Sequence, residues 1–224
     1  MRSVSQFILI GILFSVGCAP PTSAPAVETT VVDSDSERDA KTGIRRVVTG
    51  HDNSGKAVFA SDDRVQPITL ALLPGTEFYR LWGGDVPPRF PDDGSALAGD
   101  DYFPPVGGFR FGLFTVAPDS VTMPEDLDME AAFRELDEKL PGLAKYLEPD
   151  NPGMHRTATI DYEYVVSGRC VLELDDGATR ELGPGDTIVQ NGTRHAWRNP
   201  YSEPCVMVVV LVGVHNDLVM PAGQ

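Results

Sequence analysis

Two histidines and a carboxylate in the C-terminal half of the chain are the residues best suited to chemistry. His155, Asp161 and His195 offer two imidazoles and one carboxylate. That set suits a divalent iron ion with positions left open for substrate and oxygen, and it also suits Mn or Zn. Glu163 follows Asp161 by two residues, so on a strand both carboxylates share one face. Glu163 is therefore a candidate ligand, or a residue that supports one.

Other side chains near these residues are placed by the alternation of a strand. Thr157 and Trp197 each stand two residues from a histidine, so each should share the face of that histidine. Trp197 is a candidate wall for an aromatic substrate, and equally a candidate core residue. Tyr162 and Tyr164 have the opposite parity to Asp161. They should face outward or across a subunit contact.

The segment that carries these residues, 152–212, is predicted to be a series of short strands. Glycine-containing turn signals recur at 167–168, 175–177, 183–186 and 191–192. Short strands with such turns are typical of a sandwich or a jelly roll. Residues 205–214 are almost all apolar, as expected for a strand in a barrel interior.

The preceding part of the chain is also predicted to be mostly β. Short strands are expected at 44–49, 56–60, 77–82 and 109–117, and a long irregular loop at 83–108. One helix is expected, because apolar residues recur at three- and four-residue steps between 129 and 140. Thr122 and Glu125 are spaced as a capping box that could start this helix.

The residues of 152–212 resemble the two sequence motifs of the cupin superfamily. Elements of the first motif are His155-Arg-Thr157, Asp161 and Gly168. Elements of the second are Gly185 and Gly192-Thr-Arg-His195-Ala-Trp-Arg-Asn199. The chain is most similar to small single-domain cupins with a variant His-x-Thr motif. The resemblance implies an all-β cupin jelly-roll (double-stranded β-helix) barrel, with extra N-terminal strands and one or two peripheral helices.

The resemblance also implies a function, with two alternatives left open. Cupins with a full metal site use three His and one Glu, where this chain has Thr157 and Asp161 in two of the four positions. The first alternative is a divalent metal (Fe, Mn, Zn or Ni) held by His155, Asp161 and His195 in an enzyme acting on a small organic molecule, such as a dioxygenase, decarboxylase or isomerase. The second is a non-catalytic protein that binds or senses a small molecule without metal. Cupins commonly dimerise, so a homodimer is expected.

The N-terminus is expected to direct export. Arg2 precedes an apolar run that is too short to span a bilayer comfortably, and small residues lead to Cys18. Residues 1–18 resemble a bacterial lipoprotein signal with Cys18 as the lipidated residue, or else an ordinary signal peptide cut near Ala19. Residues 19–42 have the composition of a disordered linker, and 43–224 should form the cupin domain. The expected location is the outer membrane, facing the periplasm.

The charge of the chain limits its partners. The net charge is −15, and such a surface repels nucleic acids and anionic headgroups. A small-molecule ligand is therefore expected, no nucleic acid, and membrane contact only through the N-terminal lipid anchor. Cys170 and Cys205 lie on predicted strands, where they could pair or remain buried free thiols.

Overall fold

The computed structural model describes residues 43–95 and 99–218. The expected signal segment with Cys18 and the expected linker at 19–42 lie outside the described residues. Among the described residues, no helix combines the length and apolar character needed to cross a membrane.

Strand β11 (Cys205–Gly213) is the centre of the larger sheet. Every second side chain of β11 is buried, including Met207 and Val209, so its apolar run supplies the inner face of the sheet. On one side it pairs antiparallel with β5 (Phe109–Val116), and on the other with β6 (Thr159–Ser167). Strands β3 (Ile68–Thr69), β4 (Glu77–Gly84) and β9 (Thr187–Asn191) complete the order β3-β4-β5-β11-β6-β9.

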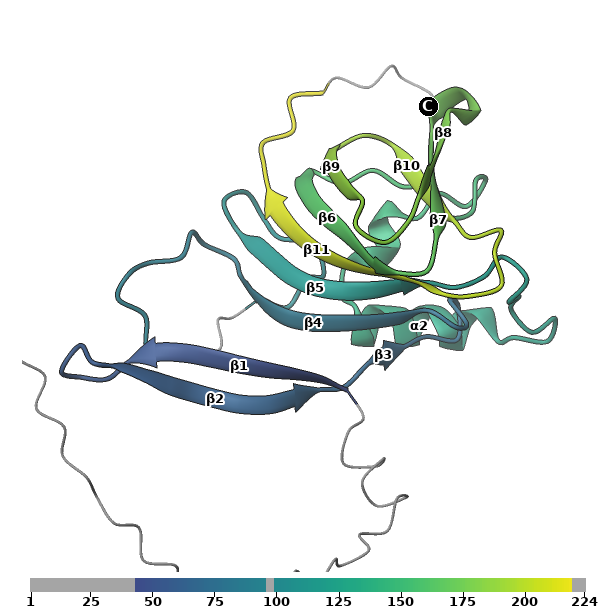
Figure 1. Cartoon of the computed structure of the whole chain (residues 1–224). Coiled ribbons are helices and arrows are strands. Elements are labelled where there is room, and N and C mark those ends of the chain that lie inside the picture. The colour runs from purple at the N-terminus through teal and green to yellow at the C-terminus, as the bar shows by residue number, and fades with distance from the viewer. Residues whose placement is uncertain (1–42, 96–98, 219–224) are drawn as a thin grey trace, which may run out of the picture. The chain divides into compact units, whose positions relative to one another are not determined.

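A smaller sheet closes the barrel. It has the order β10-β7-β8 and consists of β7 (Cys170–Leu174), β8 (Thr179–Leu182) and β10 (His195–Arg198). A short 3-10 helix, η2 (Asp175–Gly177), joins β7 to β8. Buried side chains from both sheets, among them Val165, Cys170, Ile188 and Met207, form one core cluster between them. Figure 1 shows β7, β8 and β10 curling over the concave side of β5, β11 and β6.

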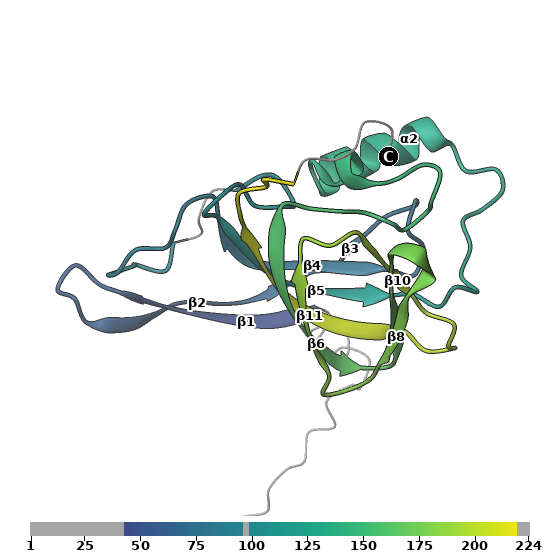
Figure 2. The ribbon, with the colours of Figure 1, turned by 90° about the horizontal axis from the view of Figure 1, so that it is seen from above.

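The first two strands form a separate ribbon at the edge of the barrel. Strands β1 (Ile44–His51) and β2 (Ala57–Val65) pair only with each other as a two-stranded sheet. Arg46 of β1 ties the ribbon to the barrel, because its Nη1 donates to the carbonyl of Leu81 in β4 at 2.9 Å. The hairpin extends beyond the end of β4 (Figure 2).

Helix α2 (Met129–Lys139) packs beside the barrel. Its Leu136 and the following Leu140 are both 0% exposed, and they contact Leu70 and Phe78 in a second core cluster. The 3-10 helix η1 (Leu143–Tyr146) follows and adds Leu143 to the same cluster. The proposed Thr122–Glu125 capping box is wrong. The N-cap is Asp128, whose carboxylate accepts from the Ala131 N–H, because helical backbone begins only at Met129.

The fold expectation is confirmed. The protein is an all-β cupin jelly-roll barrel with extra N-terminal strands, and the described residues add one α-helix and short 3-10 helices. The described part of the long loop expected between 83 and 108 contains no strand beyond the last residues of β4. Strand β2 runs five residues past the predicted end at 60 because it continues to pair with β1 as far as Val65↔Ile44.

Candidate functional site

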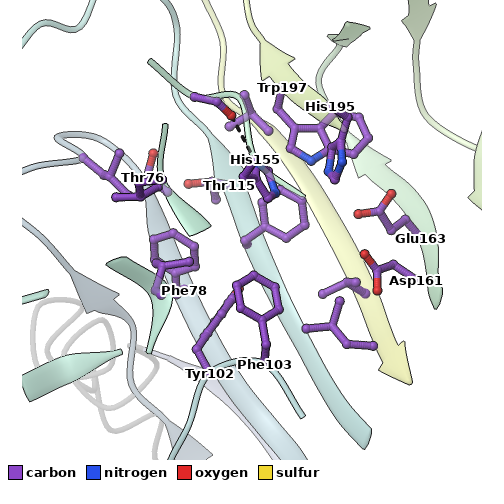
Figure 3. A pocket seen from close by; sticks show the side chains of 18 residues that line it. Thr76, Phe78, Tyr102, Phe103, Thr115, His155, Asp161, Glu163, His195 and Trp197 are labelled. Carbon is purple, nitrogen blue, oxygen red and sulfur yellow. Dashed lines mark hydrogen bonds between the residues drawn. The ribbon is translucent and has the colours of Figure 1, made fainter. Parts of the chain in front are cut away.

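A cavity of about 200 Å³ lies inside the barrel, between the two sheets and the segment that follows α2. Most of its lining is apolar, and five aromatic side chains contribute to it: Phe78, Tyr102, Phe103, Phe114 and Trp197. Four ionisable side chains also line it: His155, Asp161, Glu163 and His195. Figure 3 shows both carboxyl groups beside one another, with the two imidazoles pointing into the same space. We call this space the barrel cavity.

The two histidines are held together by their own backbones. His155 and His195 form an isolated antiparallel bridge, with N–H to carbonyl distances of 2.9 and 3.0 Å in the two directions. This bridge brings the ring centroids to 4.3 Å from each other. His155 and His195 are 40 positions apart in the sequence, but the bridge places both imidazoles in the lining of one cavity.

Backbone carbonyls also select the tautomer of each imidazole. His155 Nδ1 lies 3.0 Å from the Gly153 carbonyl and His195 Nδ1 lies 2.9 Å from the Thr193 carbonyl. A carbonyl oxygen only accepts, so each Nδ1 carries the hydrogen and each Nε2 keeps a free lone pair. Histidines that bind metals are anchored through the other ring nitrogen in the same way.

Burial keeps both imidazoles neutral. It lowers the pKa of His155, and it lowers the pKa of His195 to about 4, with a further contribution from the neighbouring His155. At neutral pH both rings are therefore uncharged bases. This is the form in which imidazole binds a metal or accepts a proton.

The two carboxyl groups come from one face of β6. Asp161 is 4% exposed and Glu163 is 6% exposed. Asp161 Oδ1 and Glu163 Oε2 are buried without any hydrogen-bond partner. Burial raises the pKa of Asp161 to about 6, and burial together with the Asp161 charge raises that of Glu163 to about 8. Two desolvated carboxyl groups without a cationic partner form a site that favours a cation or a proton.

The predicted ligands share the barrel cavity without forming a compact ligand cluster. His155, Asp161 and His195 all line the cavity. Within residues 43–95 and 99–218, however, no three His, Cys, Asp or Glu side chains are grouped so that they could hold a metal ion. The donors fit a divalent metal in kind, because two neutral imidazoles face two carboxyl groups with unpartnered oxygens.

Thr157 is not beside the histidines in the cavity. It is buried, yet it does not line the cavity, and its hydroxyl lies 2.7 Å from the Thr159 hydroxyl. The expectation that it shares a face with His155 is wrong, because β6 begins only at Thr159 and residues 156–158 lie outside any strand. Strand alternation therefore cannot relate these positions.

The other parity expectations hold. Trp197 lines the cavity, and Glu163 lines it together with Asp161. Tyr162 and Tyr164 are exposed at 52% and 47%, so they face outward as predicted. Cys170 and Cys205 are both buried free thiols.

Several residues that line the cavity were not expected from the sequence. Tyr102 and Phe103 come from the loop between β4 and β5, while Leu143 and Leu147 come from η1 and its end. The adjacent aromatic residues Tyr102 and Phe103 could have indicated this, since large aromatic side chains within a loop rich in Gly, Pro and Asp are usually buried against a core. The buried Gln190, which does not line the cavity, was also missed. It pairs with Asp161 across β6 and β9 and is 4% exposed with no partner for Nε2.

Two arginines hold the segment before His155 against the barrel. Arg194 donates to both carboxylate oxygens of Glu148, with Nε at 2.8 Å from Oε1 and Nη2 at 2.5 Å from Oε2. Its Nη1 also donates to Asp175 at 2.8 Å. Arg198 adds a bond of 2.8 Å to the Pro152 carbonyl. These contacts position the backbone that presents His155 to the cavity.

A known family model matches the part of the chain that contains the four ionisable residues of the cavity. Residues 147–211 match the family model Cupin_2, described as a cupin domain. This match agrees with the jelly-roll topology of the two sheets that enclose the cavity.

Relatives in curated collections match mostly over a short stretch. Oryzines biosynthesis cluster protein J of Aspergillus oryzae is 47% identical over 49 residues, which are 22% of this chain and 27% of that protein. The chain thus spans about a quarter of that relative's length. The cupin-domain-containing oxidoreductase srdB of Neurospora crassa is 25% identical over 175 residues, covering 75% of this chain and 73% of the relative. Among solved structures, the polyketide cyclase RemF of Streptomyces resistomycificus has 20% identity and a TM-score of 0.36, over 66% of this chain and 72% of RemF.

Proposed function

We propose that the barrel cavity binds a divalent metal ion and acts on a small, largely apolar organic molecule as an oxidoreductase. His155 and His195 would hold the metal, together with a carboxylate from Asp161 or Glu163. The observation that carries the proposal is the pairing of two anchored, neutral imidazoles with two unpartnered carboxyl oxygens in one cavity. A cation there would offset the cost of burying the carboxylates. The name of the srdB relative supports the oxidoreductase class.

The residues of this chain would bind and orient the substrate. When bound, the metal would supply Lewis-acid or redox chemistry. The aromatic and aliphatic lining favours an apolar substrate and excludes water. The carbonyls of Gly153 and Thr193 keep both imidazoles oriented. With its pKa at about 8, Glu163 holds a proton at neutral pH in the metal-free site and can pass it to an acceptor in the cavity.

Thermal unfolding with added metals tests this proposal without a known substrate. Binding to the folded state alone raises stability by about 2.7 kcal/mol at a hundredfold excess over Kd. We expect Fe, Mn, Zn or Ni to raise the melting temperature of the wild type, and His155→Ala and His195→Ala each to abolish the rise. The matched control is His51→Ala, since His51 lies on β1 and does not line the barrel cavity. A rise that persists in both site variants would contradict the proposed ligands.

Metal-free binding of a small molecule is the second candidate. It is favoured by the absence of a compact ligand cluster among residues 43–95 and 99–218 and by an apolar cavity that can hold a ligand unaided. In that case small apolar compounds raise the melting temperature in the presence of a chelator, and the metals do not.

The expected homodimer stays a prediction, to be measured by light scattering.

A further inference from the structure

We propose that a second site, outside the barrel cavity, binds the oxyanion of a small molecule that carries a carboxylate or phosphate group. The site is a hollow of about 260 Å³ lined by Arg46, Arg80, Arg110 and Trp82 together with backbone of β4. It shares no lining residue with the barrel cavity. We call it the arginine pocket.

Three strands supply the arginine side chains. Arg46 lies on β1, Arg80 on β4 and Arg110 on β5. Strands β4 and β5 are paired, and Arg46 reaches the Leu81 carbonyl of β4, so residues of the ribbon and of the barrel edge line the pocket together. The net charge of the chain is −15, yet three guanidinium groups meet in this hollow, and one that has no ion-pair partner would attract an anion.

Two of the three guanidinium groups are neutralised within the chain. Arg46 donates to both carboxylate oxygens of Asp63, at 3.1 and 2.8 Å. Arg110 donates to Asp85 Oδ1 at 2.6 Å, and its other N–H groups donate to backbone carbonyls. These two arginines are fixed in place and form walls of the pocket.

Arg80 is the unneutralised member. Its Nη2 donates to the Gly99 carbonyl at 2.7 Å and more weakly to the Asp101 carbonyl at 3.4 Å. Within the described ranges no carboxylate forms an ion pair with it, and its Nε and Nη1 have no partner among the hydrogen bonds found there. Burial, and then the charge of Arg110, lower the pKa of Arg80. A half-buried cation beside a second cation is costly, and a bound oxyanion offsets that cost.

The backbone around the pocket leaves room for the side chain of Arg110 in its wall. The pairing register of β4 with β5 shifts between Arg80 and Trp82, and such irregularities redirect side chains near binding sites. A Cβ at Gly99 would lie 3.1 Å from Arg110 Cζ, and one at Gly83 would lie 2.8 Å from Arg110 Cδ. Glycine at both positions therefore lets Arg110 occupy its place in the wall.

Trp82 indicates what the rest of the ligand is like. The guanidinium carbon of Arg46 lies 5.6 Å from the centroid of the Trp82 ring, so this ring is held by a cation–π contact. A fixed aromatic surface beside guanidinium forks suits a ligand with an apolar body attached to its oxyanion. We therefore expect an apolar carboxylate to bind more tightly than acetate.

Tryptophan fluorescence gives a direct test. The chain has two tryptophans, Trp82 and Trp197, so a Trp197→Phe variant reports on Trp82 alone. We would titrate this variant at low ionic strength with inorganic phosphate, acetate and cyclohexanecarboxylate, none of which absorbs where tryptophan does. A saturable fluorescence change is expected with phosphate or with a carboxylate, weakened by added salt. The response to each probe tells the phosphate and carboxylate alternatives apart.

Two further substitutions in the Trp197→Phe background complete the test. Arg80→Gln should weaken binding about tenfold or more, the loss expected for a charged hydrogen bond. Arg134→Gln makes the same charge change at an exposed residue of α2 and should leave the affinity unchanged. Because Arg80→Gln removes an unpaired cation, its melting temperature in anion-free buffer should equal or exceed that of its parent. An absent response to all three probes, or equal affinity with and without Arg80, would overturn the proposal.

Discussion

The carboxyl group of Glu163 is held in its protonated form at neutral pH by the folded chain. Its pKa is raised from 4.5 to about 8 by burial and by Asp161, so the unfolded chain releases this proton at a lower pH than the folded chain. Stability must therefore fall as pH rises between these values. His155 and His195, whose pKa values are lowered by burial, act in the opposite direction around and below their ordinary pKa of 6.5. Between pH 6.5 and 8 Glu163 makes the largest expected contribution, and a Glu163 variant separates it from the remaining titration of the histidines.

We predict that the metal-free protein loses up to about 2 kcal/mol of unfolding free energy between pH 6.5 and pH 8, at 1.36 kcal/mol per pKa unit. Glu163→Gln should remove most of this loss, since an amide does not ionise. Urea unfolding in the presence of a chelator at the two pH values measures the effect. Glu138→Gln, at an exposed position of α2, should behave as the wild type. A Glu163→Gln protein with the wild-type slope would refute the assignment.

A residue-scale prediction also follows from the position of Thr157. Substitution by His would restore a ligand type of the cupin motif, but this side chain is 4% exposed, outside the cavity lining and bonded to Thr159. We expect Thr157→His to cost about 1–3 kcal/mol through overpacking and to leave metal affinity unimproved. Calorimetric titration with Zn and urea unfolding measure the two quantities. Tighter binding at unchanged stability would show that position 157 does reach the cavity.

Helix α2 stabilises one side of the barrel cavity, although it contributes no side chain to the lining. Leu136 is 0% exposed and packs with Phe78 and Leu143, both of which line the cavity. Leu136→Ala should cost about 2–5 kcal/mol. Phe133 of the same helix is 46% exposed, so Phe133→Ala should cost less than about 1 kcal/mol. Urea unfolding of both variants checks the prediction, and similar costs would contradict the packing described for α2.

The elements show what could be read from the sequence and what could not. Alternation along β6 placed Asp161 and Glu163 inward and Tyr162 and Tyr164 outward, because each lies within one regular strand. The same rule misplaced Thr157, which precedes the strand. Local patterns also found α2 but not its N-cap at Asp128.

Contacts between distant segments were not predictable in this way. The bridge between His155 and His195 joins residues that no local pattern relates. Tyr102 and Leu147 reach the cavity from irregular segments, whose path depends on tertiary packing rather than on periodicity. The resemblance to cupin motifs pointed to both histidines, but the orientation of each imidazole depends on the carbonyls of Gly153 and Thr193.

At the scale of the whole molecule, the proposed export of the protein depends on its N-terminus. The lipoprotein hypothesis rests on residues 1–18 of the sequence and remains a proposal. If Cys18 is lipidated, the protein should fractionate with membranes, and Cys18→Ser should release it or block its processing. Immunoblotting of membrane and soluble fractions from a bacterial host checks this. An unchanged membrane fraction in the Cys18→Ser variant would exclude the lipid anchor.

Metal content of the purified protein tests the central proposal most directly. Residues 43–224, purified without chelator and loaded separately with Fe, Mn, Zn or Ni, would be desalted and measured by elemental analysis. We predict about one metal ion per chain in the wild type and a strong loss of bound metal in both His155→Ala and His195→Ala. No bound metal in any wild-type sample, with melting temperatures unaffected by all four ions, would contradict it and leave metal-free binding of a small molecule as the function of the cavity.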